Sequence, residues 1–425
     1  MPPRCIEPAR GRLRGTFRAP SSKSATHRAL LAAALASGRS TVRLPLDAED
    51  TRVTLDGLAA LGIPVSDEGD CWHVTGTGGP VPGGGNVALG ASGSSARFLT
   101  ALAALGRAPS RLDGTPRLRE RPMHELIDAL AAAGAHVAPS AGGRFPLAAG
   151  GTAVRGGRLV VAGNRSSQFA SALLLIGCAC REGIELVVPE PRVSWSYVRM
   201  TIEMLEAFGA RVVVADDGGL AVPPQRLTAT TVTIEADHSS ASYAFAATVV
   251  VGGRTTAAGL RSASAQPDAR FLRDLAGLGA RVVESEGGIV VDADGAIPAF
   301  AWDLSDAPDL APGAAVLALF AEGPSSLSGL HHLRLKESDR VEAIRRNLER
   351  MGAAVSVSDG TIGITPPGPA IHGATIETMG DHRIAMAFAV AGLRVPGVTI
   401  DDDLVVAKSY PQFWRDFEEW SKVDR

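Results

Sequence analysis

Cysteine is scarce in this chain. Its 425 residues include only four cysteines, whose spacing forms neither a disulfide framework nor a C-x-x-C metal motif. Cys178 and Cys180 fall in an apolar helical stretch, where we expect them to fill the core. Because residues 1–15 also lack the apolar run of a signal peptide, we expect a cytoplasmic protein.

Long hydrophobic runs and large charged patches are missing too. The longest apolar runs, such as residues 170–180, are too short to span a bilayer, so no membrane partner is expected. The net charge is −3 and no basic patch is visible, which argues against a nucleic-acid partner. These observations predict a globular protein, which we also expect to be a monomer.

Several familiar catalytic motifs are absent. The sequence has no GxxxxGK phosphate loop, no GxSxG nucleophile elbow and no HExxH zinc motif. The glycine-rich residues 76–90 lack the strand–GxGxxG–helix order of a dinucleotide site, so we predict turns between strands there. No cluster of zinc or magnesium ligands is apparent, and we expect neither a metal nor a cofactor.

Lysine is also rare, since only four of the 42 basic residues are lysine. Lysine can lose its proton when buried whereas arginine cannot, so its few positions are candidates for chemistry. Lys23, Lys336 and Lys408 lie in short polar motifs, and Lys422 lies in the C-terminal tail.

The first of these motifs lies in residues 20–38, which read PSSKSATHRALLAAALASG. The serines predict the start of a helix, and Gly38 predicts its end. The helix is apolar on nearly every side, so it should be buried. Its N-terminus, with Lys23, Ser24 and Arg28, favours an anion site. The alternative is an ordinary capped core helix with a solvated lysine.

Two phrases alternate along the chain. One is a helical pattern that ends in Gly-Ala or Gly-Ile before a β-type run, as in residues 271–282. The other is a small polar cap followed by a wholly apolar helix, as in residues 166–183. Both recur about every 70 residues, giving six units if a degenerate copy from Tyr410 is counted. A chain of this length exceeds one ordinary core, so we expect two α/β domains of three units each, with a boundary near residues 235–240.

Further polar motifs lie at or near the starts of predicted helices. At helical spacing, Lys336 and Arg340 would share one helix face beside Glu337. Such cations at helix N-termini, in a chain of negative net charge, predict a positive cleft for strongly anionic substrates. The motifs are LGASGSSAR (89–97), RLRERP (117–122), NRSSQF (164–169), LRLKESDR (333–340), GDHRIAMAF (380–388), VVAKSYP (405–411) and the Pro308–Asp309 pair.

In order along the whole chain, these motifs resemble the signatures of the 5-enolpyruvylshikimate-3-phosphate synthase family. The matching segments are PSSKSATHR, RERP, SSQF, VSWSY, IEADHSSASY, KESDR, DHRIAM and VAKSYP. The resemblance implies an inside-out α/β prism with buried parallel helices and six βαβαββ repeats, three per domain. It implies one domain from residues 1–19 plus 236–425, an inserted domain from 20–235, and an active site in the cleft between them.

The resemblance also implies the substrates and the roles of individual residues. The enolpyruvyl group of phosphoenolpyruvate would pass to the 5-hydroxyl of shikimate 3-phosphate. Asp309 would take the hydroxyl proton, and Glu337, with Lys23, His382 and Lys408, would handle the methylene proton. Phosphoenolpyruvate would be held by Lys23, Gly93, Arg121, Gln168, Arg340, Arg383 and Lys408. Shikimate 3-phosphate would be held by Lys23, Ser24, Arg28, Ser166, Ser167, Gln168, Ser194, Tyr197, Asp309 and Lys336.

The chain departs from the family pattern in a few places, so the alcohol that accepts the enolpyruvyl group could differ from shikimate 3-phosphate. The alternatives are an enolpyruvyl transferase acting on a nucleotide or a UDP-sugar, or a silent paralogue that only binds phosphometabolites. The UDP-sugar branch lacks support because its usual loop cysteine has no counterpart between Arg107 and Glu125. Around Gly93, the family's Asn-Ala-Gly-Thr run is replaced by Ala91, Ser92, Gly93 and Ser94. The other departures are Phe98, where family members commonly have proline, Trp195–Ser196, where a Lys-Pro or Arg-Pro pair is common, and His332, where some members have asparagine.

Overall fold

The computed structural model describes residues 3–215 and 218–423. The chain divides into two compact units. Unit 1 joins the N-terminal segment up to Pro20 to the chain from Ala236 onward, and unit 2 is Ser21–Glu235. The described residues form six small sheets with helices between the strands, so the predicted α/β class is confirmed.

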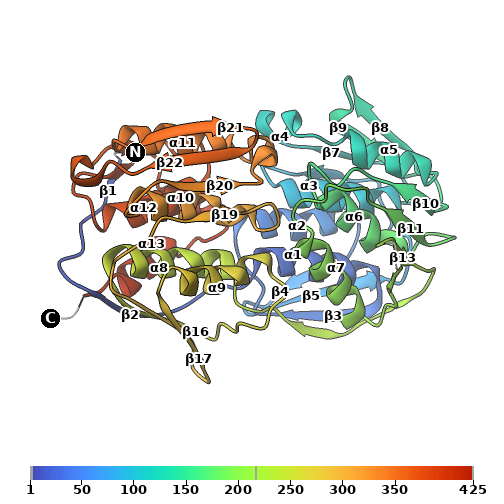
Figure 1. The fold of residues 1–425 in the computed structure, drawn as a ribbon. Helices are drawn as coiled ribbons and strands as arrows, with labels where there is room; N and C mark the ends of the chain where they lie inside the picture. The colour runs from blue at the N-terminus through green and yellow to red at the C-terminus, as the bar shows by residue number, and fades with distance from the viewer. Residues whose placement is uncertain (1–2, 216–217, 424–425) are drawn as a thin grey trace. The chain divides into compact units, whose positions relative to one another are not determined.

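Each unit contains three helices that are buried along almost their whole length. The sequence predicts this, because a helix that is apolar all round has no face to turn to water. Within each unit the three helices contact one another, and Figure 1 shows α8, α10 and α12 side by side. The buried helices are α1 (Lys23–Leu35), α3 (Gly93–Ala104) and α6 (Gln168–Gly177) in unit 2, and α8 (His238–Val251), α10 (Ala311–Leu319) and α12 (His382–Gly392) in unit 1.

In unit 2, each buried helix packs against its own sheet. Every sheet has parallel pairing on one side and antiparallel pairings on the other, and in the first of these sheets two short strands form the parallel side. The sheet over α1 contains β3 (Ala36–Arg43), β4 (Val65–Asp67), β5 (Cys71–Thr77), β14 (Leu227–Thr228) and β15 (Thr231–Thr233); that over α3 contains β6 (Asn86–Ala88), β7 (Ser110–Asp113), β8 (Val137–Ser140) and β9 (Arg144–Ala149); that over α6 contains β10 (Gly157–Val160), β11 (Ile184–Val187), β12 (Val213–Val214) and β13 (Leu220–Val222).

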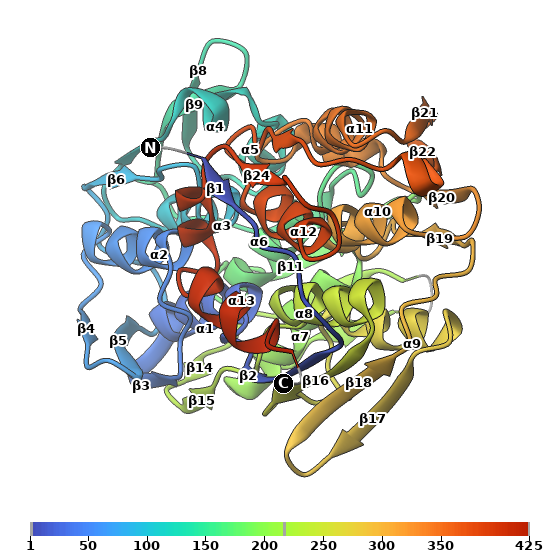
Figure 2. The ribbon, with the colours of Figure 1, turned by 90° about the vertical axis from the view of Figure 1, so that its left-hand side faces the viewer.

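Unit 1 repeats this arrangement, as Figure 2 shows for the strands beside α8 and α10. The N-terminal segment supplies β1 and β2 to two of the three sheets. The sheet over α8 contains β2 (Leu13–Arg18), β16 (Gly253–Ala258), β17 (Arg281–Ser285) and β18 (Gly288–Ala293); that over α10 contains β19 (Ala301–Asp303), β20 (Ser325–Ser328), β21 (Ala354–Ser358) and β22 (Thr361–Thr365); that over α12 contains β1 (Arg4–Cys5), β23 (Thr375–Ile376) and β24 (Thr399–Ile400).

The repeated phrase that ends in Gly-Ala or Gly-Ile forms surface helices, each ended by a glycine. Gly62, Gly134, Gly209, Gly279 and Gly352 follow the last helical residues with φ between 81° and 97°. This left-handed conformation suits glycine and closes a helix C-terminus, which is why the Gly-Ala and Gly-Ile phrase recurs. The helices are α2 (Glu49–Ala60), α5 (His124–Ala132), α7 (Ser196–Ala207), α9 (Arg270–Gly277) and α11 (Arg340–Arg350), and the degenerate copy gives α13 (Phe413–Trp420).

The remaining helical segments are short. The glycine-rich residues between β5 and β6 form no helix, as predicted. Within the described residues, no helix is both long enough and apolar enough to cross a membrane. The short segments are α4 (Pro116–Glu120) and the 3₁₀ turns η1 (Pro267–Ala269), η2 (Pro308–Leu310), η3 (His331–Leu335), η4 (Gly368–Ala370) and η5 (Leu404–Lys408).

The end of the first buried helix was predicted wrongly. α1 ends at Leu35, and Gly38 lies inside β3 with φ 107° instead of closing the helix. The partner of Gly38 across the sheet is Gly76 on β5. A Cβ at Gly76 would lie 2.2 Å from the Ala33 carbonyl oxygen, so β5 packs directly on the last turn of α1. This contact lets the chain pass from helix to strand without a loop.

The placement of Lys336 and Arg340 on one helix face was also wrong. α11 begins at Arg340 because the Asp339 side chain caps it, accepting a hydrogen bond from the Glu342 amide at 3.1 Å. Lys336 instead ends η3 in an extended conformation. Glu337 therefore lies in a short connection and not on a helix.

The two apolar cysteines belong to the core, although α6 ends before them. Cys178 and Cys180 follow Gly177 and are 5% and 2% exposed. Burial raises the pKa of both thiols to about 12, so they stay protonated at neutral pH.

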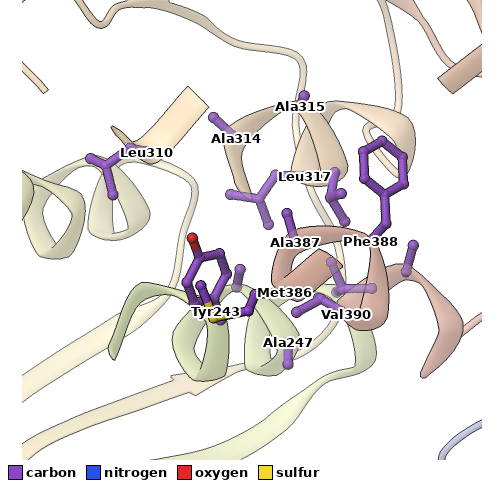
Figure 3. Packing of buried hydrophobic residues seen from close by; sticks show 14 of the residues in the cluster. Tyr243, Ala247, Leu310, Ala314, Ala315, Leu317, Met386, Ala387, Phe388 and Val390 are labelled. Atoms are coloured by element: carbon purple, nitrogen blue, oxygen red, sulfur yellow. The ribbon is translucent and has the colours of Figure 1, made fainter. Parts of the chain in front are cut away.

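The three helices of unit 1 interlock through large side chains. Figure 3 shows Tyr243 from α8, Leu317 from α10, and Met386 and Phe388 from α12 packed together with alanines between them. All four large side chains are at most 1% exposed. The alanines let the helix backbones approach closely, and the large residues fill the space between.

We predict that Leu317→Ala strongly destabilises the protein. Leu317 is fully buried, so the smaller side chain leaves a cavity costing about 2–5 kcal/mol of unfolding free energy. Leu404→Ala is the matched control, because Leu404 is 58% exposed. Denaturant unfolding of both variants measures the difference, and equal losses would contradict the packing described here.

Candidate active site

The N-terminus of α1 carries the lysine that the sequence singles out. Ser22 caps the helix by accepting a hydrogen bond from the Ala25 amide at 3.4 Å. Lys23 is the first helical residue, and its Nζ lies 3.0 Å from Oδ2 of Asp50 on α2. The two side chains are 14% and 4% exposed, so this ion pair is largely shielded from water. Lys23 is therefore not the solvated residue of the alternative interpretation.

Arg28, one turn further along α1, is buried among neutral oxygens. Its guanidinium donates to the Ser24 and Tyr197 carbonyls, both at 2.9 Å, and to the Thr201 hydroxyl at 2.8 Å. A weaker fourth bond reaches the Ser171 hydroxyl at 3.4 Å. Burial lowers the pKa of Arg28 to about 10, because all these partners are uncharged. The arginine thus ties together the segments that carry Ser24 and Tyr197.

The start of α3 brings a backbone and a guanidinium together. Ser92 caps the helix, and Gly93 is its first residue. A Cβ at Gly93 would lie 2.4 Å from Nη1 of Arg121, so only glycine leaves room for that side chain. Arg121 is 6% exposed, and Arg97 braces the neighbouring loop by donating to the Pro122 carbonyl at 2.7 Å. Of the three arginines in RLRERP, the buried one therefore faces Gly93.

The starts of α6 and α7 hold the remaining candidates of unit 2. Gln168 begins α6 and donates from Nε2 to the Ser94 hydroxyl at 3.1 Å, which links the starts of α6 and α3. The Ser166 hydroxyl accepts from the Gln168 amide at 3.2 Å. Ser167 is buried, and Ser194 is held in the left-handed region with φ 56°. Non-glycine residues adopt this conformation when the surroundings impose it, often at functional sites.

In unit 1, Arg340 binds three carboxylates. Its Nη1 donates to Asp309 at 2.8 Å, its Nη2 to Glu337 at 2.8 Å, and its Nε to Asp381 at 2.7 Å. Burial disfavours the charged guanidinium, but the three carboxylates outweigh it and raise the pKa of Arg340 above its usual value. The two candidate catalytic carboxylates, Asp309 and Glu337, therefore share one buried cation.

Arg383 connects the same cluster to the other buried helices of unit 1. It lies in the first turn of α12 and donates from Nη2 to Oδ2 of Asp309 at 2.7 Å. Its Nη1 lies 3.5 Å from the Tyr243 hydroxyl on α8. Asp309 belongs to η2, directly before α10. Polar groups of η2, of the first turn of α12 and of the second turn of α8 thus meet.

Three further candidates of unit 1 differ in exposure. Lys408 and His382 are buried, at 7% and 0% exposed, whereas Lys336 is half-buried. Nearby, His332 is 1% exposed, and neither ring nitrogen has a hydrogen-bond partner among the described residues. Burial, together with the charge of Lys336, lowers the pKa of His332 to about 3, so this imidazole is neutral at physiological pH.

Three buried aspartates in these clusters were not among the predicted site residues. Asp381 is fully buried and holds Arg340, and only its position before an apolar helix pointed to it. Asp268 on η1 accepts a bond from the Ser239 hydroxyl, and burial and the charge of Asp309 raise its pKa to about 7. Asp50 pairs with Lys23 from a surface helix, and no sequence signal marks it.

The predicted residues are thus divided between the two units. Within the described residues, no group of three or more histidine, cysteine or acidic side chains has the geometry of a metal site. Unit 2 contains Lys23, Ser24, Arg28, Gly93, Arg121, Ser166, Ser167, Gln168, Ser194 and Tyr197, and unit 1 contains Asp309, Lys336, Glu337, Arg340, His382, Arg383 and Lys408.

Sequence comparisons place this chain among proteins of one activity. Residues 8–417 match the family model described as EPSP synthase (3-phosphoshikimate 1-carboxyvinyltransferase). A 3-phosphoshikimate 1-carboxyvinyltransferase from Methanoculleus marisnigri is 39% identical over 407 residues, covering 95% of this chain and 96% of the relative. Another, from Syntrophobacter fumaroxidans, is 39% identical over 430 residues, covering 97% and 98%.

Solved structures agree with the sequence comparison. An EPSP synthase from Acinetobacter baumannii superposes with a TM-score of 0.79 at 26% identity, covering 99% of this chain and 98% of the other. The enolpyruvyl transferase NikO from Streptomyces tendae, at 18% identity and a TM-score of 0.75, shares the fold. The full-length family match and the close relatives together show that this chain belongs to the EPSP synthase family.

Proposed function

We propose that this protein transfers the enolpyruvyl group of phosphoenolpyruvate to the 5-hydroxyl of shikimate 3-phosphate and releases phosphate, a step of the shikimate pathway. The observation that carries this proposal is the Arg340 cluster, in which one buried guanidinium holds Asp309 and Glu337. An addition followed by an elimination needs one group for the hydroxyl proton and another for the C3 proton, and two carboxylates can fill these two roles. Family membership supports the same reaction.

The reaction makes and breaks bonds in two stages. First, C3 of phosphoenolpyruvate takes a proton, C2 becomes electrophilic, and the 5-oxygen adds to C2 while its proton goes to Asp309. The tetrahedral intermediate then loses a proton from C3 and releases phosphate from C2, which restores the double bond. Glu337 is proposed to handle the C3 proton, with Lys23, His382 and Lys408 close to the transfer. Because a C–O bond breaks, no phosphoryl group is transferred and the scheme calls for no cofactor.

The two substrates are proposed to divide the polar residues between them. Four of the five N–H donors of Arg28 bond to acceptors within unit 2, so its proposed role includes orienting Ser24 and Tyr197. For phosphoenolpyruvate we propose Lys23, Gly93, Arg121, Gln168, Arg340, Arg383 and Lys408. For shikimate 3-phosphate we propose Lys23, Ser24, Arg28, Ser166, Ser167, Gln168, Ser194, Tyr197, Asp309 and Lys336.

The anionic substrate has to compete with the protein's own carboxylates. Arg340 and Arg383 both pair with Asp309, at 2.8 and 2.7 Å. A phosphoenolpyruvate anion bound by these arginines would replace part of that pairing and loosen Asp309. A carboxylate released from two guanidiniums is a stronger base than one held by both, so substrate binding would prepare Asp309 for its proton.

The finer features of the fold are proposed as well. We propose that each unit is an inside-out α/β prism of three βαβαββ repeats with parallel buried helices. Three mutually contacting helices, each covered by its own sheet, support this arrangement. The domain limits at residues 20 and 236, the active site in the interdomain cleft, domain closure, the monomeric state and the cytoplasmic location stay predictions.

The deciding experiment is phosphate release by the purified protein. We expect release when phosphoenolpyruvate is supplied with shikimate 3-phosphate, and none with UMP or UDP-N-acetylglucosamine as acceptor. Release only with a nucleotide or a UDP-sugar would establish another enolpyruvyl transferase. No release with any acceptor, together with retained ligand binding, would favour the silent paralogue.

We predict that Glu337→Gln binds both substrates but turns over slowly. The amide is nearly isosteric but cannot exchange a proton, so kcat should fall by about 10²–10⁴. Steady-state kinetics and equilibrium binding measure the two effects. Wild-type turnover in this variant would remove Glu337 from the mechanism.

We predict that Gly93→Ala weakens phosphoenolpyruvate binding. The new methyl group would occupy the space of the Arg121 guanidinium, 2.4 Å away, and displace it. We expect KM for phosphoenolpyruvate to rise about tenfold, with a smaller change in KM for shikimate 3-phosphate. Gly277→Ala is the control, because nothing lies within 4 Å of a Cβ there. An unchanged KM would show that Arg121 does not bind the substrate.

We predict that Asp381→Asn destabilises unit 1 and lowers activity. Asp381 is fully buried, and its loss leaves Arg340 undercompensated, costing about 3–5 kcal/mol of unfolding free energy at pH 7. Burial opposes ionisation of Asp381, but Arg340 outweighs it, so the pKa of this carboxyl lies below its usual range.

The pH dependence tests the cause. A depressed carboxyl pKa stabilises the fold above the ordinary carboxyl pKa, and this contribution disappears as pH falls through the folded-state pKa. The stability gap between wild type and Asp381→Asn should therefore shrink in acid. Asp128→Asn, at an exposed position of α5, is the control. A gap that stays constant with pH would contradict the electrostatic explanation.

A further inference from the structure

We propose that Asp50 is a positioning residue for this reaction, whose carboxylate aims the Lys23 ammonium at the substrate anions without touching them. The inference rests on the proposed function, in which Lys23 contacts both substrates. Asp50 belongs to none of the motifs that carry the family resemblance. It is the second residue of α2, on the polar start of a surface helix.

The first argument is the isolation of the ion pair. Asp50 Oδ2 lies 3.0 Å from Lys23 Nζ, and it is the one hydrogen-bond partner that Lys23 has among the described residues. A lysine side chain is flexible, and an ammonium with no anchor samples many positions. With Asp50 only 4% exposed, water cannot readily take the place of its carboxylate. The direction of the Lys23 side chain is therefore set by Asp50.

The second argument is that Asp50 is itself held in place. Its backbone carbonyl accepts a bond from the Ser95 hydroxyl at 3.1 Å. The Ser95 hydroxyl also lies 2.7 Å from that of Ser92 and 2.8 Å from that of Thr54, and Thr54 reaches His27 Nδ1 at 2.7 Å. These buried contacts join α1, α2 and the start of α3, where Gly93 lies. Asp50 is thus part of a rigid support that spans two parts of the proposed substrate site.

The third argument concerns charge. Asp50 neutralises Lys23 and adds a negative charge beside a site for anions, so it cannot serve to attract phosphoenolpyruvate. Removing its charge makes the region more positive and should leave substrate affinity unchanged or higher. Loss of the anchor, however, leaves the ammonium poorly aimed in the transition state. The inference therefore predicts a fall in kcat without a rise in KM.

The test uses the full-length chain and phosphate release with varied phosphoenolpyruvate. We expect Asp50→Asn to lower kcat about tenfold or more while KM for phosphoenolpyruvate stays equal or falls. Asp50→Glu keeps the charge but shifts it by one methylene, so it should recover part of kcat. Glu49→Gln removes an exposed charge from the same helix turn and should behave as wild type.

A double-mutant cycle separates positioning from a purely structural tie between α1 and α2. If Asp50 acts through Lys23, adding Asp50→Asn to Lys23→Met should cause no further loss of the residual rate. Additive losses, or a raised KM with normal kcat, would overturn the inference. Thermal unfolding of each variant shows whether it is folded. If Asp50→Asn is unstable, the kcat of Asp50→Glu, alone and combined with Lys23→Met, provides the test instead. Absence of phosphate release by the wild type would instead refute the proposed function.

Discussion

The structure depends on helices that have no polar side. Each buried helix is enclosed by two neighbouring helices and its own sheet, so a polar side chain on its side surface needs a partner inside the protein. Thr100 and Thr248, for example, donate to backbone carbonyls of their own helices, and the charged residues of these helices lie in the first two turns. At the N-terminal ends the unpaired amides and the helix dipole favour anions. The fold thus favours the starts of the helices as places for anion-binding residues, and the candidates Lys23, Gly93, Gln168 and Arg383 occupy first turns.

The buried arginines of the two units have different kinds of hydrogen-bond partner. Arg340 in unit 1 is compensated by three carboxylates, two of which are proposed to act in catalysis. Such a cluster holds the carboxylates in place, and under the proposed binding scheme an anionic substrate would replace part of this pairing. The acceptors of Arg28 among the described residues of unit 2 are neutral, so a phosphate bound there would displace no carboxylate from it. In the proposed scheme, the proton-transferring carboxylates Asp309 and Glu337 belong to unit 1, and both units contribute cations that bind the substrates.

The sequence predicted those features that are local in the chain. The cap at Ser22, the all-round apolar helices and the glycine after each surface helix all follow from residues a few positions apart. It failed where a long-range contact decides the outcome. The end of α1 depends on Gly76 in a facing strand, and the partners of Lys23 and Arg340 lie 27 and 41 positions away. The roles assigned to individual site residues came from family resemblance and stay predictions.

The altered segment 91–98 changes the support of the site more than its contact surface. Gly93, which faces Arg121, is retained, while Ser92 caps α3 and extends the hydroxyl chain toward Asp50. Phe98, at a position where relatives commonly have proline, is 1% exposed, and its ring lies 5.3 Å from the Arg28 guanidinium. An aromatic face stabilises a nearby cation, which offsets part of the desolvation of Arg28 in a pocket of neutral oxygens. The departures from the family pattern thus adjust how Lys23 and Arg28 are held.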